Sequence, residues 1–474
     1  MKRVAVIGGG IGGMTAAAEL ARAGHQVTLF EQGQALGGKA QVVTHAGLKL
    51  DTGPTLLTMP HVVRETFARL DATDLLPRFL RLPMHARYTW SDGRTLDCAD
   101  DLDATADAAQ QFGDGAGLRA FYADAERIHH AAGEPYLEAP FDGALPLMTR
   151  VARRGVASAL TSLSLPSLDA LARKHFHSPQ LQQFAGRFAT YAGASPYEAS
   201  AAFAMIPHIE RAFGVHHAEG GMAALVAALG EALRRAGVTL KFGAKAGWAT
   251  HGRELLAGPE GDAHAFDSIV VNQDPLHGRD APLALSGYVA LLEVDRRLSL
   301  PHHSVAFTDD PKREFAALFR GELPADTTVY VCHPAASDPT VAPEGRSGLF
   351  VMVNAPALRG ASDEAAWATH APRLRELCLA TVRRLAPDAA NASMQLVGER
   401  TPVDLQRGGA PGGSIYGFLP HGRFGPFSRP RMRADTRGVF FAGGGTHPGG
   451  GVPLVMLSGH FASTLVQRHL EARS

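Results

Sequence analysis

The sequence contains few of the residues and patterns that mark several common classes of protein. It has only three cysteines in 474 residues, and none forms a C-x-x-C pair. This argues against a disulfide framework or a cysteine zinc site and fits a reduced, cytoplasmic chain. Lys and Arg together number 46, as do Asp and Glu, so no charge excess indicates nucleic-acid binding. Because no run of about 18 uninterrupted apolar residues is present, we expect no membrane-spanning helix.

Signatures of metal-dependent and nucleophilic catalysis are also missing. The 22 histidines include adjacent pairs at residues 129–130, 216–217 and 302–303, but adjacent side chains on a helix or strand point apart. His175-x-His177 has ligand-like strand spacing but falls in an expected helix. No H-E-x-x-H, G-x-S-x-G or catalytic-cysteine signature occurs. We therefore predict no metal site.

What the sequence does contain is a strong nucleotide-binding pattern near its start. Residues 4–7 form a short apolar run, as in a strand that is buried on both faces of a parallel sheet. Residues 14–23 indicate a helix, and residues 26–30 a second strand that ends on Glu31. The turn between the first strand and the helix follows the spacing G-x-G-x-x-G, with Gly8, Gly10 and Gly13. Since all parts occur in order, the pattern is more specific than a lone glycine motif.

Each residue type in this pattern suits the binding of a dinucleotide. Gly8 permits a tight turn, Gly10 lets a pyrophosphate approach the backbone, and Gly13 lets the helix pack closely on the strand. The helix N-terminus offers free N–H groups to the phosphates. Glu31 can accept hydrogen bonds from the hydroxyls of an adenosine ribose. The apolar segment after Met1 is not expected to be a signal peptide, because cleavage near residues 16–18 would destroy this site. The motif alone does not separate FAD from NAD.

Two further turns, at residues 37–39 and 51–55, follow soon after. The first, Gly-Gly-Lys, carries a basic residue that suits a pyrophosphate arriving over the first helix, although alone it would read as a surface turn. The second, Asp-Thr-Gly-Pro-Thr, is tight and polar and follows a short strand. Turns that return repeatedly to one cofactor are typical of large FAD folds, because FAD is extended and touches several chain segments.

These three segments resemble the phytoene desaturase family of carotenoid flavoenzymes, within the wider amine-oxidase-like class of FAD proteins. The resemblance implies an α/β fold with a discontinuous Rossmann-like FAD-binding domain and a mixed α+β substrate domain. It implies FAD contacts at the fingerprint glycines and Glu31, and at the two turns, through Gly38, Lys39, Gly53, Pro54 and Thr55. The wider family usually has Arg in place of Lys39. Lysine keeps the charge but loses the two-pronged geometry.

The later segments extend the resemblance over nearly the whole chain. Ala246 stands where the family usually has a valine whose backbone meets the adenine. The last motif, at residues 438–464, reads as a strand, a glycine-rich turn and a helix that begins near Pro453. In the family this helix points its N-terminus at the flavin, where its dipole stabilises negative charge. The implied FAD contacts here are Ala246, Gly443, Gly444, Thr446, Pro453 and Leu454.

Composition and motif positions predict a chain that alternates between two domains. FAD-binding parts are expected at residues 1–75, 213–285 and 425–474, and substrate-domain parts at residues 76–212 and 286–424. The first substrate part reads as largely helical, without a glycine turn after an apolar strand. Residues 187–222 are rich in aromatic and aliphatic side chains that can line a long apolar tunnel or belong to the core.

Residues 144–166 combine aliphatic side chains with Arg150, Arg153 and Arg154. A basic amphipathic helix of this kind can lie on a membrane surface, but it can equally be a packed helix with a solvated basic face. The resemblance implies a lipid-soluble substrate, which favours the first reading. We therefore expect a cytoplasmic enzyme that associates peripherally with the inner face of the cell membrane.

The function implied by the resemblance is FAD-dependent desaturation of a carotenoid, by loss of a hydride to the flavin and of a proton from the neighbouring carbon. The final motif, at residues 449–459, looks closest to members that perform 3,4-desaturation of 1-hydroxycarotenoids. Phytoene desaturation, carotenoid isomerisation and carotenoid binding without turnover remain alternatives. Oxygen or a quinone is the expected electron acceptor, and no nucleic acid is expected to bind. No catalytic residue is assigned, since His447 beside the flavin turn is as well explained by a structural role.

Overall fold

The N-terminal strand lies in the middle of a five-stranded sheet in the computed structural model, which describes residues 1–141, 143–251, 254–276 and 280–472. The sheet order is β19–β13–β1–β2–β9, and all neighbouring strands are parallel. The strands are β1 (Arg3–Ile7), β2 (Gln26–Phe30), β9 (Thr239–Lys241), β13 (Ser268–Val271) and β19 (Val439–Phe441). Distant parts of the chain thus build one sheet, which confirms the predicted discontinuous, Rossmann-like α/β fold. The exact domain borders remain a prediction.

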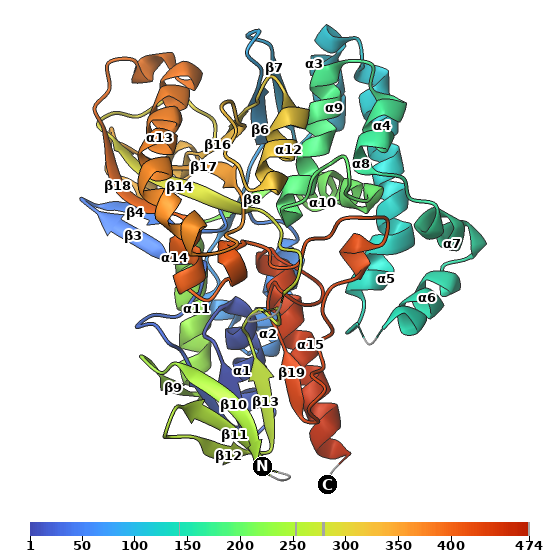
Figure 1. The fold of residues 1–474 in the computed structure, drawn as a ribbon, viewed down its shortest axis with the longest axis vertical. Coiled ribbons are helices and arrows are strands. Elements are labelled where there is room, and N and C mark those ends of the chain that lie inside the picture. Colours follow the sequence, from blue (N-terminus) through green and yellow to red (C-terminus); the bar gives the residue numbers. More distant parts are fainter. Residues whose placement is uncertain (142, 252–253, 277–279, 473–474) are drawn as a thin grey trace.

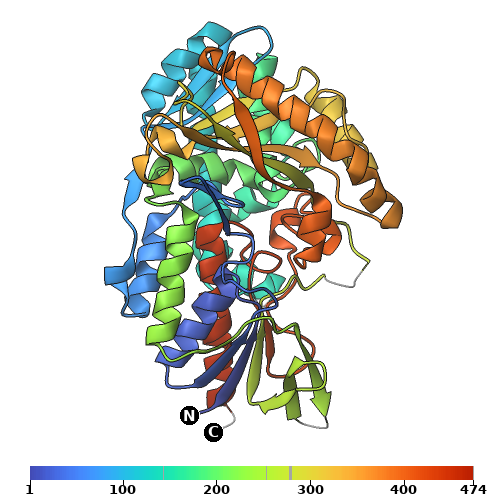
Figure 2. The ribbon, with the colours of Figure 1, turned by 90° about the vertical axis from the view of Figure 1, so that its left-hand side faces the viewer.

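The two faces of this sheet pack on different layers, as Figure 2 shows. Val4 and Val6 of β1 belong to a core shared mainly with four helices, whereas Ala5 and Ile7 belong to a core shared with a three-stranded antiparallel sheet. Because successive side chains of a strand alternate between faces, burial on both sides explains the uninterrupted apolar run. The helices are α1 (Ile11–Arg22), α2 (Pro60–Arg69), α11 (Met222–Arg235) and α15 (Val452–Glu471), and the strands are β10 (Ala246–His251), β11 (Glu254–Pro259) and β12 (His264–Phe266).

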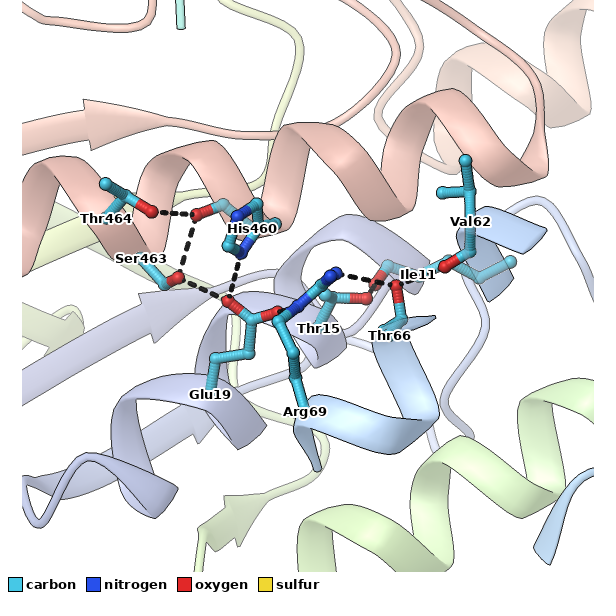
Figure 3. Close-up of polar contacts among 9 residues, drawn as sticks. All are labelled: Ile11, Thr15, Glu19, Val62, Thr66, Arg69, His460, Ser463 and Thr464. Atoms are coloured by element: carbon cyan, nitrogen blue, oxygen red, sulfur yellow. Dashed lines mark hydrogen bonds and ion pairs between the residues drawn. The ribbon is translucent and has the colours of Figure 1, made fainter. Parts of the chain in front are cut away.

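Helices α1, α2 and α15 are joined by a partly buried polar network around Glu19 (Figure 3). Its carboxylate accepts hydrogen bonds from Arg69 Nε at 2.8 Å and from Ser463 Oγ at 2.6 Å. His460 Nδ1 lies 2.9 Å from the same group. The Glu19 side chain is only 8% exposed, so these partners satisfy a carboxylate that would otherwise be costly to bury.

A second, seven-stranded sheet forms the other part of the molecule, in the order β18–β14–β17–β16–β15–β6–β7. All its neighbouring strands are antiparallel except β15 and β6. Helix α13 (Ala361–Leu385) packs on it through a core that contains Trp367 and Leu374; on the other face lies the hairpin β3 (Val42–His45) and β4 (Leu48–Asp51), whose Leu48 and Leu50 contact the sheet. The strands are β6 (Met84–Thr89), β7 (Thr95–Ala99), β14 (Ser286–Val294), β15 (His303–Ala306), β16 (Val329–Cys332), β17 (Ser347–Ala355) and β18 (Met394–Arg400).

Residues 76–212 are mainly helical, as expected, but with two differences. Strands β6 and β7 form a hairpin there and pair with the larger sheet, and β5 (Phe79–Arg81) pairs with β8 (His216–Ala218). The expected amphipathic helix over residues 144–166 is two helices, which protrude from one side of the molecule (Figure 1). Gly155 separates them with a φ of +99°, a conformation that favours glycine and ends the first helix.

The remaining helices lie around the larger sheet or between the two sheets, except for the protruding α6 and α7 (Figure 1). They are α3 (Leu102–Ala108), α4 (Gly115–Ile128), α5 (Glu134–Leu137), α6 (Ala144–Arg153), α7 (Val156–Leu163), α8 (Leu168–His175), α9 (Pro179–Gly186), α10 (Met205–Phe213), α12 (Pro311–Arg320) and α14 (Pro402–Arg407). Helices α4, α8 and α9 share a core with β6 and β7, so the hairpin and the helical part form one packed unit.

Candidate functional site: a cofactor and substrate cavity

The turns that were predicted to hold the cofactor line one cavity of about 1240 Å³. Of the fifteen predicted cofactor-binding residues, thirteen lie on its wall: Gly8, Gly10, Glu31, Gly38, Lys39, Gly53, Pro54, Thr55, Ala246, Gly443, Gly444, Pro453 and Leu454. These positions come from six separate stretches of sequence. The structure therefore brings the predicted residues together, and their contacts with the cofactor remain a prediction.

Helices α1 and α15 begin at the glycine turns of this cavity. Helix α1 starts at Ile11 after Gly10, and α15 starts at Val452 after Gly451, and all four residues line the wall. The first N–H groups of a helix have no partner within it and carry partial positive charge. Two N-termini directed at one cavity therefore suit a ligand with negative charge at two places, such as the pyrophosphate and the electron-rich ring of a flavin dinucleotide.

Gly13 and Thr446 are the two predicted residues that do not line the cavity. A Cβ atom on Gly13 would lie 2.2 Å from the carbonyl oxygen of Gly8, so only glycine permits this approach of α1 to the turn. Thr446 is fully buried, and its hydroxyl donates to the carbonyl of Pro430 at 2.7 Å. The geometry thus gives Gly13 a packing role and Thr446 a role in holding the last glycine turn.

The two charged residues predicted to bind the cofactor are held in place by the backbone. The carboxylate of Glu31 accepts hydrogen bonds from the N–H groups of Gly9 and Gly33, both at 2.7 Å, and its other lone pairs remain available for ribose hydroxyls. Lys39 Nζ donates to the carbonyl of Ile415 at 2.5 Å. Burial lowers the pKa of Lys39, and the nearby charge of Asp274 opposes this shift.

Several polar residues on the same wall were not predicted from the sequence. Asn272 Nδ2 donates to the carbonyl of Gly8 at 3.3 Å, and Arg429 Nη1 donates to the carbonyl of Gly444 at 3.0 Å. Asn272 and Asp274 directly follow β13 and line the cavity. Polar residues at the carboxyl end of a buried parallel strand are a usual sign of a ligand site, so this signal was present in the sequence. Arg429 carried no comparable signal.

His447 is not among the residues that line the cavity. Its ring packs between Tyr136, at 4.4 Å between ring centroids, and Phe461, at 5.5 Å. Its Nε2 atom lies 3.0 Å from the carbonyl oxygen of Ala139. Burial lowers its pKa to about 3, so the ring is neutral near pH 7. These contacts support a structural role for His447.

The cavity continues from the glycine turns into the second part of the molecule. There polar side chains such as Gln183 and His303 line the wall together with apolar side chains from α10, the segments before it and the seven-stranded sheet. The apolar residues include Phe203, Ile206, Ile209, Val305, Phe307, Phe350 and Met352. Some aromatic residues of the stretch 187–222 thus line the cavity, whereas Phe188 lies in the core. Among the apolar residues stand the side chains of Arg187, Tyr191 and Glu210.

One histidine pair departs from expectation. The rings of His302 and His303 lie 4.6 Å apart between centroids, and ligand atoms of both side chains and of Cys332 lie within 4.8 Å of one another. His302 precedes β15, so the alternation of a regular strand does not separate the two rings. Burial raises the pKa of the Cys332 thiol and lowers that of His302, so the group is uncharged. The absence of a metal remains a prediction.

Comparison with known proteins gives consistent matches. A family model described as flavin containing amine oxidoreductase matches residues 11–246. The chain is 34% identical to a hydroxyneurosporene desaturase of Cereibacter sphaeroides, with 100% of this chain and 99% of that protein covered. It is 26% identical to a 1-hydroxycarotenoid 3,4-desaturase of a Flavobacterium species, with 98% and 99% covered. Cyclohexylamine oxidase from Brevibacterium oxydans shares the fold, with a TM-score of 0.62, 17% identity and 99% of both chains covered.

Proposed function

Since the chain belongs to the carotenoid desaturase family of flavin-containing amine oxidoreductases, we propose that it desaturates the 3,4 bond of a 1-hydroxycarotenoid. It is an FAD-dependent oxidoreductase that acts on CH–CH groups. One observation carries the proposal: a single cavity joins the glycine turns and two helix N-termini to a long apolar wall. Its volume exceeds the usual range of about 300–1,000 Å³ for small-molecule sites. It therefore suits a dinucleotide together with a polyene.

The chemistry divides between the cofactor and the chain. FAD, when bound, supplies the acceptor for a hydride from one carbon of the new double bond, while the neighbouring carbon loses a proton. The apolar wall binds the polyene, excludes water and holds one C–C bond in position. Phe307, Phe350 and Met352 can do this without directional contacts. The N-terminus of α15 favours negative charge at the adjacent wall, which would assist removal of a hydride from the substrate.

The exposed face of α6 and α7 supports a location at the membrane surface. Leu145, Val156 and Leu160 are 77%, 78% and 63% exposed on two helices that contact each other, and apolar side chains exposed in this way are typical of interaction sites. Arg153, in the last turn of α6, is also exposed and can meet anionic lipid headgroups. Among the described residues, no helix is both long enough and apolar enough to cross a bilayer. We therefore propose that these two helices rest on the membrane rather than enter it as a span.

The same helices lie next to the cavity wall. Leu147, on the inner side of α6, shares a small core with Tyr136 and Phe427, and both aromatic residues line the cavity. A carotenoid dissolved in the bilayer would thus meet the protein close to the apolar part of the cavity. A membrane-bound quinone or dissolved oxygen would be the acceptor that reoxidises the cofactor.

The proposal can be tested by expressing the protein in bacteria that accumulate phytoene, neurosporene or lycopene, or their 1-hydroxy derivatives. If only the hydroxylated carotenoids lose two hydrogens and shift their absorption to longer wavelength, the result would support 3,4-desaturation. Coloured products from phytoene would assign the protein to phytoene desaturation instead. A changed retention time with unchanged mass would indicate isomerisation. Carotenoid binding without anaerobic bleaching of the flavin would indicate a binding protein.

A further inference from the structure

The apolar part of the cavity contains charged and hydroxyl groups that a hydrocarbon cannot satisfy. Arg187 follows α9, and its Nη1 atom donates to the hydroxyls of Tyr191 at 3.1 Å and Tyr88 at 3.4 Å. The Tyr191 hydroxyl donates in turn to Glu210 Oε1 in α10, at 2.6 Å. All four residues line the cavity. Tyr88 and Glu210 are buried, whereas Arg187 and Tyr191 are half-buried and partly open to the cavity.

This cluster has hydrogen-bonding capacity that the protein leaves unused. Among the described residues, the Nε and Nη2 atoms of Arg187 have no hydrogen-bond partner, and Oε2 of Glu210 accepts no hydrogen bond. The guanidinium instead lies 5.4 Å from the centre of the Tyr88 ring and 5.1 Å from that of Tyr191. Packing an unsubstituted polyene against these groups would desolvate them without a replacement partner, which is costly.

The unpaired atoms of Arg187 and Glu210 determine which polar group of a substrate they can bind. Arg187 can only donate. Burial raises the pKa of Glu210, and the hydrogen bond from Tyr191 and the charge of Arg187 oppose this shift; in its ionised form Glu210 can only accept. A ketone or an ether oxygen could accept from Arg187 but could give nothing to Glu210. A hydroxyl does both, as the Tyr191 hydroxyl already does between the same two residues.

We propose that Arg187, Tyr191 and Glu210 form a binding site for the hydroxyl group at one end of the polyene. The inference rests on the proposed function and deepens it, because it assigns the residues that recognise the hydroxylated end. These residues act by binding and orienting the substrate, and they take no part in the chemical step.

The position of the cluster also bears on which bond is oxidised. Tyr88 of β6 is paired with Val305 of β15, which is paired with Tyr330 of β16, so these three residues lie side by side on the wall of the cavity. The Tyr330 hydroxyl lies 2.7 Å from Thr55 Oγ1, in a turn predicted to contact FAD. With neighbouring strands about 4.8 Å apart, Tyr88 and Tyr330 are roughly 10 Å apart along the sheet. A hydroxyl held by Arg187 would therefore present the bonds near its own end of the polyene to the cofactor.

The test compares the binding of neurosporene and 1-hydroxyneurosporene to the FAD-loaded protein, measured by quenching of tryptophan fluorescence. Arg187→Met removes the donors of the site, Tyr191→Phe removes the hydroxyl that links Arg187 to Glu210, and Tyr197→Phe is the matched control. Tyr197 lines the same cavity but packs on Phe315 instead. We expect the wild type and the control to prefer the hydroxylated carotenoid by about tenfold or more. In Tyr191→Phe and Arg187→Met this preference should largely disappear, because the hydroxyl of 1-hydroxyneurosporene loses its partners. Arg187→Met should bind neurosporene at least as tightly as the wild type does, since the donors that neurosporene would desolvate are gone.

The outcomes separate this inference from the proposed function. An unchanged preference in both variants, with normal FAD absorbance, would overturn the hydroxyl site even if the wild type desaturates its substrate. A preference that both variants lose, in a protein without turnover, would support the site and refute desaturation. If Arg187→Met fails to retain FAD, Tyr191→Phe alone decides, since it removes one oxygen atom and keeps the ring.

Discussion

Replacing Glu19 tests how the two helices that begin at the cavity are held together. Glu19 lies in α1, and its partners Arg69, His460 and Ser463 lie in α2 and α15 (Figure 3). Glu19→Gln keeps the shape of the side chain but removes its charge. It also replaces one acceptor oxygen with an amide N–H₂ that faces groups which themselves donate. The prediction is a less stable protein with the same fold.

The expected loss follows from the geometry of the network. A hydrogen bond to a charged group contributes about 1.5–3 kcal/mol, and removing one partner of a buried ion pair costs about 3–5 kcal/mol. Arg69 is 32% exposed, so its share is reduced by solvent screening. We therefore expect Glu19→Gln to lower the free energy of unfolding by about 2–4 kcal/mol.

The effect should depend on pH in a defined direction. Burial acts to raise the pKa of Glu19, but hydrogen bonds from His460, Ser463 and Arg69 outweigh it and hold the pKa below its ordinary value of 4.5. A carboxylate with a depressed pKa stabilises the fold above that value, and the stabilisation is lost as the pH falls through the pKa of the folded state. The difference between wild type and variant should therefore be constant from about pH 5 to 7 and shrink in more acidic solution.

The assay is chemical denaturation of the FAD-loaded protein, followed by circular dichroism at several pH values. Glu322→Gln is the control, because Glu322 also pairs with an arginine but is 58% exposed, and exposed pairs contribute about 0–1 kcal/mol. A double variant with Ser463→Ala should be less damaging than the sum of the two single changes. If Glu19→Gln unfolds within about 0.5 kcal/mol of the wild type, the network does not hold the helices together and the reasoning is wrong.

Three further predictions concern other parts of the molecule. Burial raises the pKa of Asp51 to about 6. Its ionisation should therefore lower the free energy of unfolding by about 3 kcal/mol as the pH rises from about 4 to 7. Denaturation curves measured over this pH range should show that Asp51→Asn abolishes the decrease. Gly13→Ala should leave the purified protein without FAD absorbance, because the Cβ atom would clash at 2.2 Å, whereas Gly247→Ala, where nothing lies within 4 Å, should keep it. The combined changes Leu145→Ser, Val156→Ser and Leu160→Ser on α6 and α7 should weaken binding to anionic vesicles about 100-fold, because each change removes about 1 kcal/mol of binding free energy. Binding is measured by sedimentation with vesicles, and unchanged binding would refute the membrane proposal.

The sequence predicted the nucleotide-binding core well because its signals are local. The strand, glycine turn, helix and second strand of residues 4–31 appear in the structure as β1, α1 and β2, with bounds that differ by at most a few residues. The last motif likewise forms β19 and α15. In both places a buried strand is followed by a tight turn that requires glycine. Such a pattern can be recognised in a short stretch of sequence, because it depends little on the rest of the chain.

Elements that depend on distant partners were harder to predict. The hairpin of β6 and β7 lies in a region that reads as helical, and β6 pairs with β15, more than two hundred residues later. Its strands are stabilised by that pairing rather than by a strong local pattern. The helix expected over residues 144–166 was divided by Gly155, whose φ of +99° the composition did not reveal.

The polar cluster of the substrate cavity shows a different limit. Arg187 and Tyr191 lie one turn apart in a segment rich in aromatic residues, and Glu210 belongs to a separate helix. In the sequence each is compatible with an ordinary solvent-facing position, and only the fold places all three on one apolar wall. An apolar wall alone would let a long polyene slide, because dispersion contacts change little when the chain shifts by one repeat of its structure. One directional anchor removes this freedom, so a polar group far from the reacting atoms can decide which bond reaches the cofactor.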